Sequence, residues 1–481
     1  MGNRAGDGPQ PLGDRAWRLA IAGADEGRAR AAALRASGRV DDAWHTETHV
    51  AFTARADVDI AALAMIAASS EIEDGREHAI RVVLDGADLG AVAVAAGLTR
   101  DDVERTIADA SLRVSFVGFA PGFGYLRGLD PRLHLPRRAT PRPRVPAGSL
   151  ALAGGFAAIY PSATAGGWHL LGRALEPMWL DDEPRLAAGD RVRLVPVGAG
   201  EAVTMIEQAA DPARALIIDE LRGLAFVEDG GRRGRLHQGM PPAGALVPSA
   251  LARANRVVGN PDGAAGIERH GALRLAATVA IDVATDDGAR HRLAPGAVLE
   301  LPWAATARAG YVAIAGGLDV PLVLGGRGTH LRAGLGGHHG RPLRRGDRIA
   351  IGTETGSGTE TDADPDPDAP ITIIAGPDLA HLGPDALDRL LAATFRLAHR
   401  SDRMGTRLDG ATLPPAAGAA PPSSAPLVLG AIEVPPDGVP IVLGPEHPTT
   451  GGYPVVAVIA AADQGAFHRR PLGRAVRFRL R

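Results

Sequence analysis

The sequence predicts a mainly β fold with some α/β elements, and two observations carry that prediction. Glycine supplies 62 and proline 38 of the 481 residues, while aromatic residues make up only 4%, a balance that favours many short strands and turns over long helices. Short apolar runs bounded by turn residues also recur along the chain. They read as strands at residues 149–155, 191–197, 311–317, 440–444 and 475–480.

Only a few helices are predicted. Residues 59–70 and 88–110 carry apolar side chains at helical spacing, and the second stretch contains a capping arrangement midway, where a new helix is expected to start. Two further helices are expected to begin at prolines. Pro248 precedes one that Gly259 closes, and Pro384 precedes the other, which fits the preference for proline in the first turn and glycine after the last.

Two segments are predicted to lack regular structure. Residues 353–370 combine acidic residues with Gly, Ser and Pro and leave too little apolar surface to offset the entropy of ordering, so we expect a disordered linker or a long surface loop. Residues 414–426 are rich in Pro, Ala and Ser, and we expect an insertion in a loop there.

The composition excludes several kinds of chemistry. The chain has no cysteine, which excludes disulfides, thiolate catalysis and cysteine zinc sites. All 52 basic residues are arginine, which excludes a P-loop lysine, a Schiff-base lysine and covalently attached biotin. The net charge of -3 without a basic stripe argues against nucleic acid, and no stretch reads as a signal peptide or a membrane span. We therefore expect a cytoplasmic protein with a small-molecule substrate and no nucleic-acid or membrane partner.

The segment 113–173 holds the most informative motifs. It contains in order GFAPGFGYL, LDPRL, PRR, PRPRVPAGS, AGG, IYP, GGW and GR. This series resembles the B subunit of bacterial ATP-dependent 5-oxoprolinase, also called allophanate hydrolase subunit 1. Glycines that let a ligand approach the backbone, next to arginines, are typical of an anion site. We expect substrate or anion contacts from Gly122, Phe123, Arg142, Gly166, Gly167 and Trp168.

From about residue 215 to the end, the chain resembles the C subunit of the same enzyme, also called allophanate hydrolase subunit 2. The matching segments are FVEDGGRRGRLHQGMPPAG, ANRVVGNPDGAAGIE, YVAIAGGLDVPLVLGGRGTHLRAGLGGHHGRPLRRGD, SDRMGTRLDG and GAIEVPPDGVPIVLGPEHPTTGGYPVVAVI. The chain therefore reads as a B-type and a C-type subunit fused end to end.

The resemblance implies cyclophilin-like β-barrels in tandem after a small N-terminal α/β domain. The expected domains are a degenerate α/β domain of the B type over 1–77, a cyclophilin-like barrel of the B type over 78–200, and two β-barrels of the C type over 215–352 and 371–481, with the linker at 353–370 between the last two.

The same resemblance implies an activity. B and C subunits act with a separate A-type subunit to open the lactam of 5-oxoproline to glutamate at the expense of ATP, with Mg2+ as the accompanying ion. Two alternatives stay open: a urea or amide carboxyltransferase component, which would need a biotin carboxylase and a biotinyl carrier on other chains, and a non-catalytic regulator of a histidine kinase. The oligomeric state is left open, with a homo-oligomer as one option.

Such a reaction must hold a substrate carboxylate and nucleotide phosphates, so acidic residues and arginines inside the motifs are the candidates. The candidate catalytic residues are Asp229, Glu268 and Glu446, with Asp402 as a further metal or base candidate. The candidate anion-binding residues are Arg232, Arg327, Arg403, Arg407, Thr449, Thr450, Gly451, Gly452 and Tyr453. The metal ligands are unknown, and His330, His338 and His339 read as loop residues.

The two Gly-Gly-aromatic turns, at residues 166–168 and 451–453, are expected to line one cleft where the B-type barrel faces the C-type domains. Several motif positions depart from the family pattern. Val247 stands where aspartate is usual, Glu433 where glutamine is usual, and Gly328 where serine is usual. These exchanges leave the choice of lactam or amide open.

Overall fold

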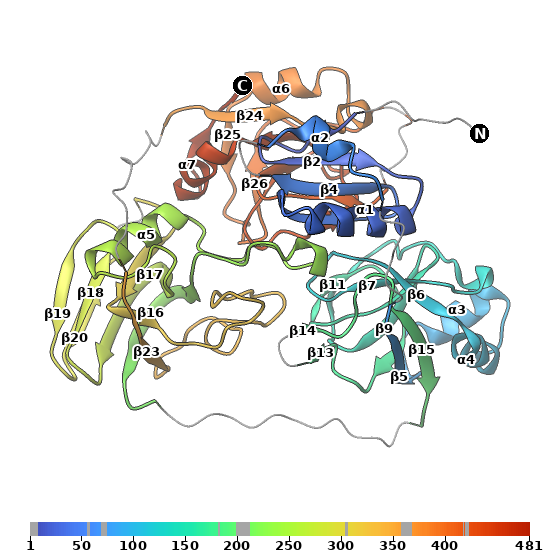
Figure 1. Cartoon of the computed structure of the whole chain (residues 1–481), viewed down its shortest axis with the longest axis horizontal. Helices are drawn as coiled ribbons and strands as arrows, with labels where there is room; N and C mark the ends of the chain where they lie inside the picture. The colour runs from blue at the N-terminus through green and yellow to red at the C-terminus, as the bar shows by residue number, and fades with distance from the viewer. Residues whose placement is uncertain are drawn as a thin grey trace.

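The computed structural model describes residues 8–54, 58–68, 75–180, 183–198, 212–303, 306–356, 368–416, 418 and 423–481. The fold is mainly β, as the sequence predicts. A four-stranded sheet, a closed barrel and two large sheets follow one another along the chain, here called the first to the fourth unit (Figure 1).

The first unit is an antiparallel sheet with strand order β1-β2-β4-β3. Its strands are β1 (Gln10–Pro11), β2 (Ala16–Ala20), β3 (Val40–His45) and β4 (His49–Ala54). Helix α1 (Ala24–Ala36) packs on this sheet through Leu34, and the short helix α2 (Ile60–Ala64) adds Leu63 to the same core. A compact α/β layer therefore opens the chain.

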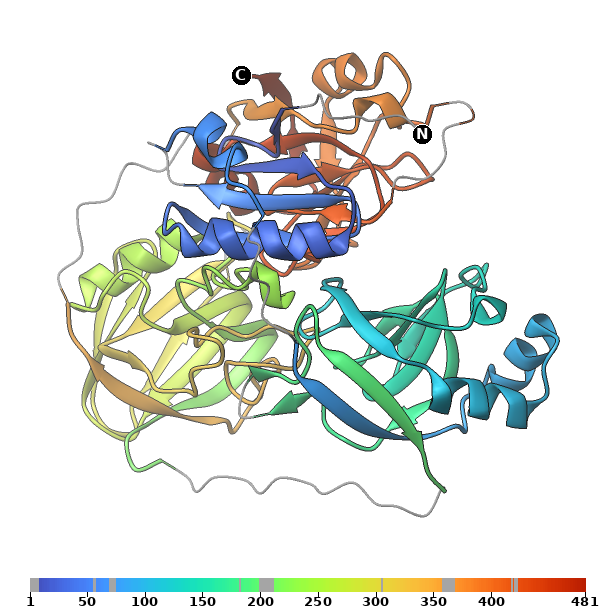
Figure 2. The ribbon, with the colours of Figure 1, turned by 45° about the vertical axis from the view of Figure 1, so that its right-hand side comes forward.

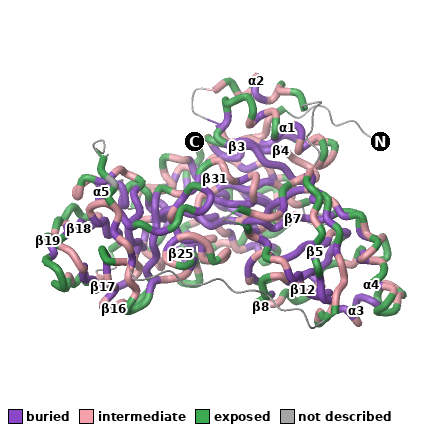
Figure 3. The backbone as a smooth tube through the Cα atoms, turned by 60° about the horizontal axis from the view of Figure 1, so that its bottom comes forward, coloured by how far each residue is buried: buried purple, intermediate pink, exposed green. Residues whose placement is uncertain are grey.

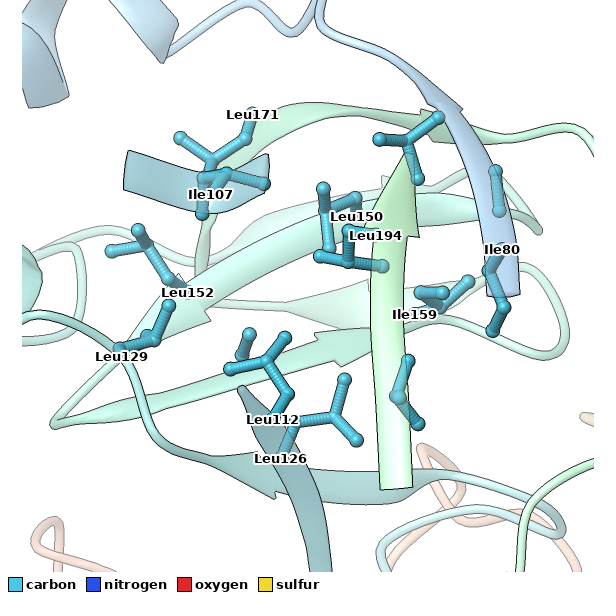
Figure 4. Close-up of a cluster of buried hydrophobic side chains, with 14 of the residues drawn as sticks. Ile80, Ile107, Leu112, Leu126, Leu129, Leu150, Leu152, Ile159, Leu171 and Leu194 are labelled. Carbon is cyan, nitrogen blue, oxygen red and sulfur yellow. The ribbon is translucent and has the colours of Figure 1, made fainter. Parts of the chain in front are cut away.

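The second unit is a closed barrel with strand order β10-β7-β6-β15-β5-β12-β9. Its strands are β5 (Glu77–Val83), β6 (Leu112–Val117), β7 (Gly124–Arg127), β9 (Ser149–Ala153), β10 (Phe156–Ile159), β12 (His169–Ala174) and β15 (Arg191–Pro196). Inward-facing side chains such as Ile80, Leu126 and Leu150 fill its interior, so the barrel is a packed core and not a channel (Figure 4).

Short elements surround the barrel. They are α3 (Leu89–Ala96), α4 (Arg100–Asp109), the 3-10 turn η1 (Pro131–Leu133), and two strand pairs, β8 (Arg142–Val145) with β11 (Thr164–Gly166) and β13 (Trp179–Leu180) with β14 (Glu183–Pro184). Thr99 and Asp102 form a complete capping box at the start of α4, as the sequence predicts.

The third unit has strand order β19-β18-β21-β17-β16-β23-β22, and β20 also pairs with β17. Its strands are β16 (Ala215–Glu228), β17 (Gly266–Ala277), β18 (Ile281–Thr285), β19 (Arg290–Leu293), β20 (Val298–Leu301), β21 (Gly310–Ile314), β22 (Gly316–Leu318) and β23 (Arg348–Glu354). The connection from β16 to β17 carries η2 (Leu236–Gln238) and α5 (Pro248–Val257).

The fourth unit has strand order β32-β25-β26-β29-β28-β31-β24-β33. Its strands are β24 (Ile371–Ala375), β25 (Phe395–Leu397), β26 (Gly405–Asp409), β28 (Ala431–Glu433), β29 (Ile441–Leu443), β31 (Val455–Ile459), β32 (Ala475–Val476) and β33 (Phe478–Leu480). Outside this sheet lie η3 (Leu379–His381), α6 (Ala386–Ala392), η4 (Ala461–Asp463), α7 (Gln464–Arg469) and the pair β27 (Ala425–Pro426) with β30 (Thr450–Gly451).

The first and fourth units pack directly against each other, although they are the most distant in sequence (Figures 1 and 2). Arg18 of β2 pairs with Asp378 at 2.6 Å, and both side chains are buried. The Trp44 indole Nε1 of β3 donates to the Thr449 carbonyl oxygen at 3.1 Å. Figure 3 shows the strands on both sides of this contact, β3, β4 and β31, as largely buried. The B-type and C-type halves are therefore joined by a buried interface as well as by the chain.

The structure corrects the helix predictions in two places. Helix α1 was not predicted, because its sequence ADEGRARAAALRA offers only alanine and one leucine as apolar residues. The helix predicted over 59–70 ends after Ala64, because only Leu63 of it is buried; residues 69 and 70 lie outside the described part. The other predicted helices form, and the proline-initiated one at Pro248 is followed by Gly259 with a φ of 76°.

The structure corrects the start of the linker that was predicted over 353–370. Strand β23 continues through Thr353 and Glu354, where it pairs with β22, so the segment predicted over 353–370 starts too early. Residues 357–367 lie outside the described part, as do 417 and 419–422 of the segment predicted over 414–426. Among the described residues, no helix combines the length and apolar character needed to span a bilayer.

Candidate functional site

A buried arginine, Arg403, lies at the centre of a group of carboxylates between the third and fourth units. Its Nη1 donates to Glu268 Oε1 at 2.5 Å, and its Nε donates to Glu446 Oε1 at 2.7 Å. Its Nη2 donates to the Gly244 carbonyl oxygen at 2.6 Å and lies 3.2 Å from Glu228 Oε1. The four charged side chains are at most 5% exposed. We name Arg403, Glu228, Glu268 and Glu446 the Arg403 cluster.

Two antiparallel strand pairs position these four residues. In the third unit, Glu228 ends β16 and Glu268 lies near the start of its partner β17. In the fourth unit, Arg403 precedes β26 and Glu446 follows its partner β29. The cluster therefore forms only where the two units meet, which accounts for the wide separation of its members in the sequence.

Glu268 is fully satisfied by hydrogen bonds. Besides Arg403, it accepts from the Leu246 N–H at 2.7 Å and the Tyr311 hydroxyl at 2.9 Å, and His270 Nε2 lies 3.0 Å from its Oε1. Burial opposes its charge, but the Arg403 guanidinium and these donors hold the pKa of Glu268 well below its usual range. Glu268 is therefore a carboxylate at neutral pH.

Glu228 is in the opposite state. Its two oxygens are buried, and neither accepts a hydrogen bond from the described residues. Burial raises the pKa of Glu228 well above its usual range, Arg403 offsets this in part, and the neighbouring charges of Glu268 and Glu446 raise it further. The protonated form of Glu228 is therefore favoured relative to an ordinary glutamate. A Cβ at Gly328 would lie 2.7 Å from Glu228 Oε2, so the glycine in place of the usual serine makes room for this side chain.

His270 links the Arg403 cluster to the backbone of Arg308. Its Nδ1 lies 2.9 Å from the Arg308 carbonyl oxygen, and its Nε2 lies 3.0 Å from a Glu268 carboxylate oxygen. These two contacts fix the orientation of the imidazole ring.

An open cavity of about 420 Å³ adjoins the Arg403 cluster, within the usual size range of a small-molecule site. Arg403 and Arg308 supply its cationic groups, and His270, Asp402 and His399 lie on its wall. The rest of the wall is mostly apolar. It consists of Leu224, Phe226, Trp303, Ala307, Leu331, Ser401, Pro471 and Leu472. The arrangement can hold a small organic anion beside two guanidinium groups, an imidazole and carboxyl groups whose pKa values are shifted in opposite directions.

The Thr449–Tyr453 turn does not line this cavity and lies against the second unit. Thr449 and Thr450 are buried, and the Thr450 Oγ1 accepts a hydrogen bond from the Phe119 N–H at 3.1 Å. Tyr453 is 46% exposed. Gly451 adjoins the buried Glu433, whose Oε1 would lie 3.0 Å from a Cβ at that position. The turn therefore forms part of the packed contact between the two halves.

The Gly166, Gly167 and Trp168 turn belongs to the same contact region. Trp168 packs at 5.6 Å from Phe123 and 5.7 Å from Tyr125, measured between ring centroids. These rings belong to a buried group, here called the aromatic cluster, that consists of Phe116, Phe119, Phe123, Tyr125, Phe156, Tyr160 and Trp168. The Phe119 N–H of this cluster donates to Thr450 Oγ1, so the aromatic cluster adjoins the other turn, and the cleft that both turns were expected to line stays a prediction. The 420 Å³ cavity, however, is lined by neither of them.

The remaining B-type candidates have structural partners. Arg142 Nη2 donates to Asp88 Oδ1 at 2.8 Å, together with Arg138 at 2.9 Å. Gly122 has a φ of 76° and donates its N–H to the Gln238 carbonyl oxygen at 3.2 Å, across the two halves.

Three of the C-type arginines and one carboxylate also serve the fold. Arg232 is buried and donates to the carbonyl oxygens of Val323, Gly326, Gly328 and Ala243. Asp229 accepts from the backbone N–H groups of Gly231 at 2.9 Å and Arg327 at 2.6 Å. Arg327 pairs with Asp319 at 3.0 Å, and Arg407 lies 3.6 Å from Asp437.

The described residues contain no group of three or more His, Asp or Glu side chains that could hold a metal ion. Within the Arg403 cluster, the guanidinium already fills the position that a cation would take. His330 is buried 3.8 Å from Glu446, and His338 lies 3.5 Å from Asp347.

Sequence reasoning missed four residues of this site: Glu228, His270, Trp303 and Arg308. Glu228 had a detectable signal, because it is an acid at the end of an apolar strand and directly precedes the candidate Asp229. Arg308 and Trp303 lie outside the quoted motifs, so only the fold reveals them.

Comparison with known proteins covers nearly the whole chain. The family model described as carboxyltransferase domain, subdomain A and B, matches residues 238–480, and the one described as carboxyltransferase domain, subdomain C and D, matches residues 28–187. The crystal structure of TTHA0988 superposes with a TM-score of 0.81 at 29% identity, over 97% of this chain and 99% of that one.

Two curated relatives each match one half. The 5-oxoprolinase B subunit of Escherichia coli O157:H7 is 44% identical over 118 residues, which is 24% of this chain and 54% of the relative. The 5-oxoprolinase C subunit of Escherichia coli K12 is 34% identical over 210 residues, which is 39% of this chain and 66% of the relative. The chain thus spans between about half and two thirds of the length of these relatives. With both halves matched by the family models, the chain belongs to the carboxyltransferase domain family and carries the A and B and the C and D subdomains together.

Proposed function

We propose that this chain supplies both the B and the C component of an ATP-dependent 5-oxoprolinase and acts with a separate A-type subunit. The proposal rests on one observation: a region similar to the B subunit and a region similar to the C subunit are folded together in one chain. The segment with the B-type motifs contacts the C-type half, where the Phe119 N–H donates to Thr450 Oγ1 at 3.1 Å and the Gly122 N–H donates to the Gln238 carbonyl oxygen at 3.2 Å. Components that must act together are here held together.

The cavity beside the Arg403 cluster suits the chemistry of this substrate. 5-Oxoproline carries a carboxylate and a lactam on a small ring, so its site needs a cation, an apolar wall and groups that exchange protons with an opening amide. Arg308 supplies positive charge, His270 lies beside it, and Trp303 supplies a flat wall. Glu228 and Glu268 both contact Arg403, and their pKa values are shifted in opposite directions, that of Glu228 upward and that of Glu268 downward. In this proposal the two carboxyl groups position Arg403 and take part in proton transfer.

ATP and Mg2+ belong to the proposal as requirements of the whole complex. The described carboxylates do not fit a metal ion, because Arg403 occupies the space between them and Asp229 is held by two backbone N–H groups. We therefore assign nucleotide and metal to the assembled enzyme and not to particular residues of this chain.

Reconstitution with an A-type subunit tests the proposal. The full chain, the A-type subunit, ATP, Mg2+ and 5-oxoproline should release glutamate and phosphate in equal amounts, and omission of any protein should stop both. Phosphate release without glutamate, or no response to 5-oxoproline, would refute it.

A carboxyltransferase component is the second candidate, because the matching family models describe that domain. It is tested in parallel by carboxyl transfer from a biotinylated carrier to urea. Transfer in that assay, without glutamate release in the first, would favour it over the oxoprolinase.

A further inference from the structure

Arg308 is a buried cation on the cavity wall that has no carboxylate partner among the described residues. The residue is only 8% exposed and lies just before β21. Its Nη1 donates to the Thr406 hydroxyl at 2.6 Å, and its Nη2 donates to the Asp402 carbonyl oxygen at 2.9 Å. A guanidinium has five N–H donors, and the others find no acceptor in the described part of the chain. Arg308 thus faces the cavity with unused donors.

The carboxylates near Arg308 are already occupied. Glu268 accepts from Arg403, Tyr311 and the Leu246 N–H, and lies against His270. The exposed Asp402 uses its Oδ1 to accept from the N–H groups of two following residues. Neither forms an ion pair with Arg308, although their charges lie close enough to favour its charged form.

Burial of a cation without a partner is unfavourable, and a bound anion would relieve that cost. Burial lowers the pKa of Arg308 to about 10, which leaves it charged at neutral pH. His270 lies on the same wall beside it. The anion would therefore meet the Arg308 guanidinium at one end of the cavity.

The rest of the wall defines the body of the ligand. Leu224, Phe226 and Trp303 form an apolar surface, and the Arg269 guanidinium lies 5.5 Å from the centre of the Trp303 ring, which fixes the position of the indole. Such walls bind a compact ring or chain and leave the charged end to the arginine.

We propose that Arg308 is the carboxylate subsite of this cavity, and that the cavity binds small monocarboxylates with a compact apolar or planar body. The identity of the carboxylate as 5-oxoproline rests on the proposed function, whereas the subsite itself does not.

The test uses the full chain alone and three small probes of similar size. They are 5-oxoproline, 2-pyrrolidinone, which is the same lactam without the carboxylate, and cyclopentanecarboxylate, which is a ring carboxylate without the lactam. Affinity is measured by titration calorimetry, and the site is located by the change in tryptophan fluorescence that Trp303→Phe removes from a chain with five tryptophans. The variants are Arg308→Gln, Arg308→Lys and, as a control on the surface of α6, Arg389→Gln.

The proposal expects both carboxylates to bind at least tenfold more tightly than 2-pyrrolidinone. Arg308→Gln should weaken both carboxylates at least tenfold and leave 2-pyrrolidinone unchanged, while Arg389→Gln should change none of the three. If Arg308→Gln fails to fold, Arg308→Lys keeps the charge and should keep the preference for carboxylates.

Several results would overturn the subsite: binding of neither 5-oxoproline nor cyclopentanecarboxylate, an affinity for cyclopentanecarboxylate no greater than that for 2-pyrrolidinone, carboxylate binding that Arg308→Gln leaves intact, or a fluorescence change that persists in Trp303→Phe. The proposed function fails separately. Binding of cyclopentanecarboxylate through Arg308 without binding of 5-oxoproline would support the subsite and count against the oxoprolinase.

Discussion

The Arg403 cluster and the aromatic cluster are both buried, both are built from family motifs, and the loop from Glu446 to Gly451 joins them, yet they differ in kind. In the Arg403 cluster, charged side chains from distant motifs contact each other at 2.5 to 2.7 Å beside an open cavity. In the aromatic cluster, the motif glycines leave room for neighbouring rings and hydroxyl groups. A Cβ at Gly166 would lie 2.3 Å from the Tyr160 hydroxyl, and one at Gly118 would collide with Thr450.

This difference shows that a glycine-rich motif and a charged motif carry different information. Glycine pairs mark places where two surfaces approach too closely for a side chain. Burying charged groups is unfavourable for stability, so buried charges from separate motifs mark places where the fold keeps polar groups together, which is typical of functional sites. We therefore expect the chemistry to take place beside Arg403, and we expect the glycine turns to serve close packing.

The largest expected effect comes from removing the cation that holds the Arg403 cluster. Arg403→Met leaves Glu268 and Glu446 buried without their counter-ion, and we expect a loss of about 3–5 kcal/mol in the free energy of unfolding. Arg407→Met is the matched control, because Arg407 is one third exposed and lies 3.6 Å from its partner Asp437, so its loss should cost less than about 1 kcal/mol. Urea unfolding measures both. Equal effects would mean that the cluster is not held by its ion pairs.

Glu433 is a buried carboxyl group without a counter-ion among the described residues, and it gives a second test of the comparison between the two clusters. Burial and, to a lesser extent, the nearby Asp378, which pairs with Arg18, raise the pKa of Glu433 to about 8. The folded state thus holds a proton that the unfolded chain loses above its ordinary pKa of 4.5. The stability contribution of this proton is complete below pH 4.5 and is lost as the pH rises to about 8.

The variant Glu433→Gln isolates this group, because glutamine stays neutral at every pH. The wild type should lose about 3–5 kcal/mol relative to Glu433→Gln as the pH rises through that window, and the difference should then stay constant. Unfolding curves of both proteins from pH 4 to pH 9 measure it. A difference that does not change with pH would show that Glu433 is not protonated in the folded protein.

Two adjacent glycines separate packing from chemistry in the aromatic cluster. Gly166→Ala forces a methyl group against the buried Tyr160 and should destabilise the protein by about 1–3 kcal/mol. A Cβ at Gly167 would lie no nearer than 3.7 Å to any atom beyond its chain neighbours, so Gly167→Ala should change the free energy of unfolding by less than about 0.5 kcal/mol. Thermal unfolding tests the pair. Similar losses for both would contradict the assignment of the turn to close packing.

The smallest effect is expected from cutting the chain between the halves. A protease site inserted within residues 199–211 and then cleaved should leave the two fragments together on gel filtration, because the Arg18–Asp378 pair and the Trp44–Thr449 hydrogen bond are buried. Separation of the fragments without denaturant would show that this interface does not hold the halves together.

Much of the fold could be predicted from the sequence, and less of the site. The strands at 149–155 and 311–317 and the helix at Pro248 follow from local patterns of apolar residues, glycine and proline, and the structure has them. Arg403, Glu268 and Glu446 were candidates because the implied reaction needs groups that hold anions, a metal or a proton, and the structure brings the three side chains together. Arg232 was an equal candidate by sequence, but it donates only to backbone carbonyl oxygens. Whether a buried arginine meets a carboxylate or a carbonyl depends on which loops face it, and no local pattern carries that information.

The most direct test of the whole account is the rate of 5-oxoproline-dependent glutamate release by the chain with an A-type subunit, compared between Glu268→Gln and Gly167→Ala. Glu268→Gln keeps the shape of the cluster but removes the charge that Arg403 and His270 share, so we expect kcat to fall at least about 100-fold. Gly167→Ala should stay within about twofold of the wild type, because its new methyl group touches nothing closely. The reverse result, with full activity in Glu268→Gln and none in Gly167→Ala, would place the chemistry at the glycine turns and contradict the account.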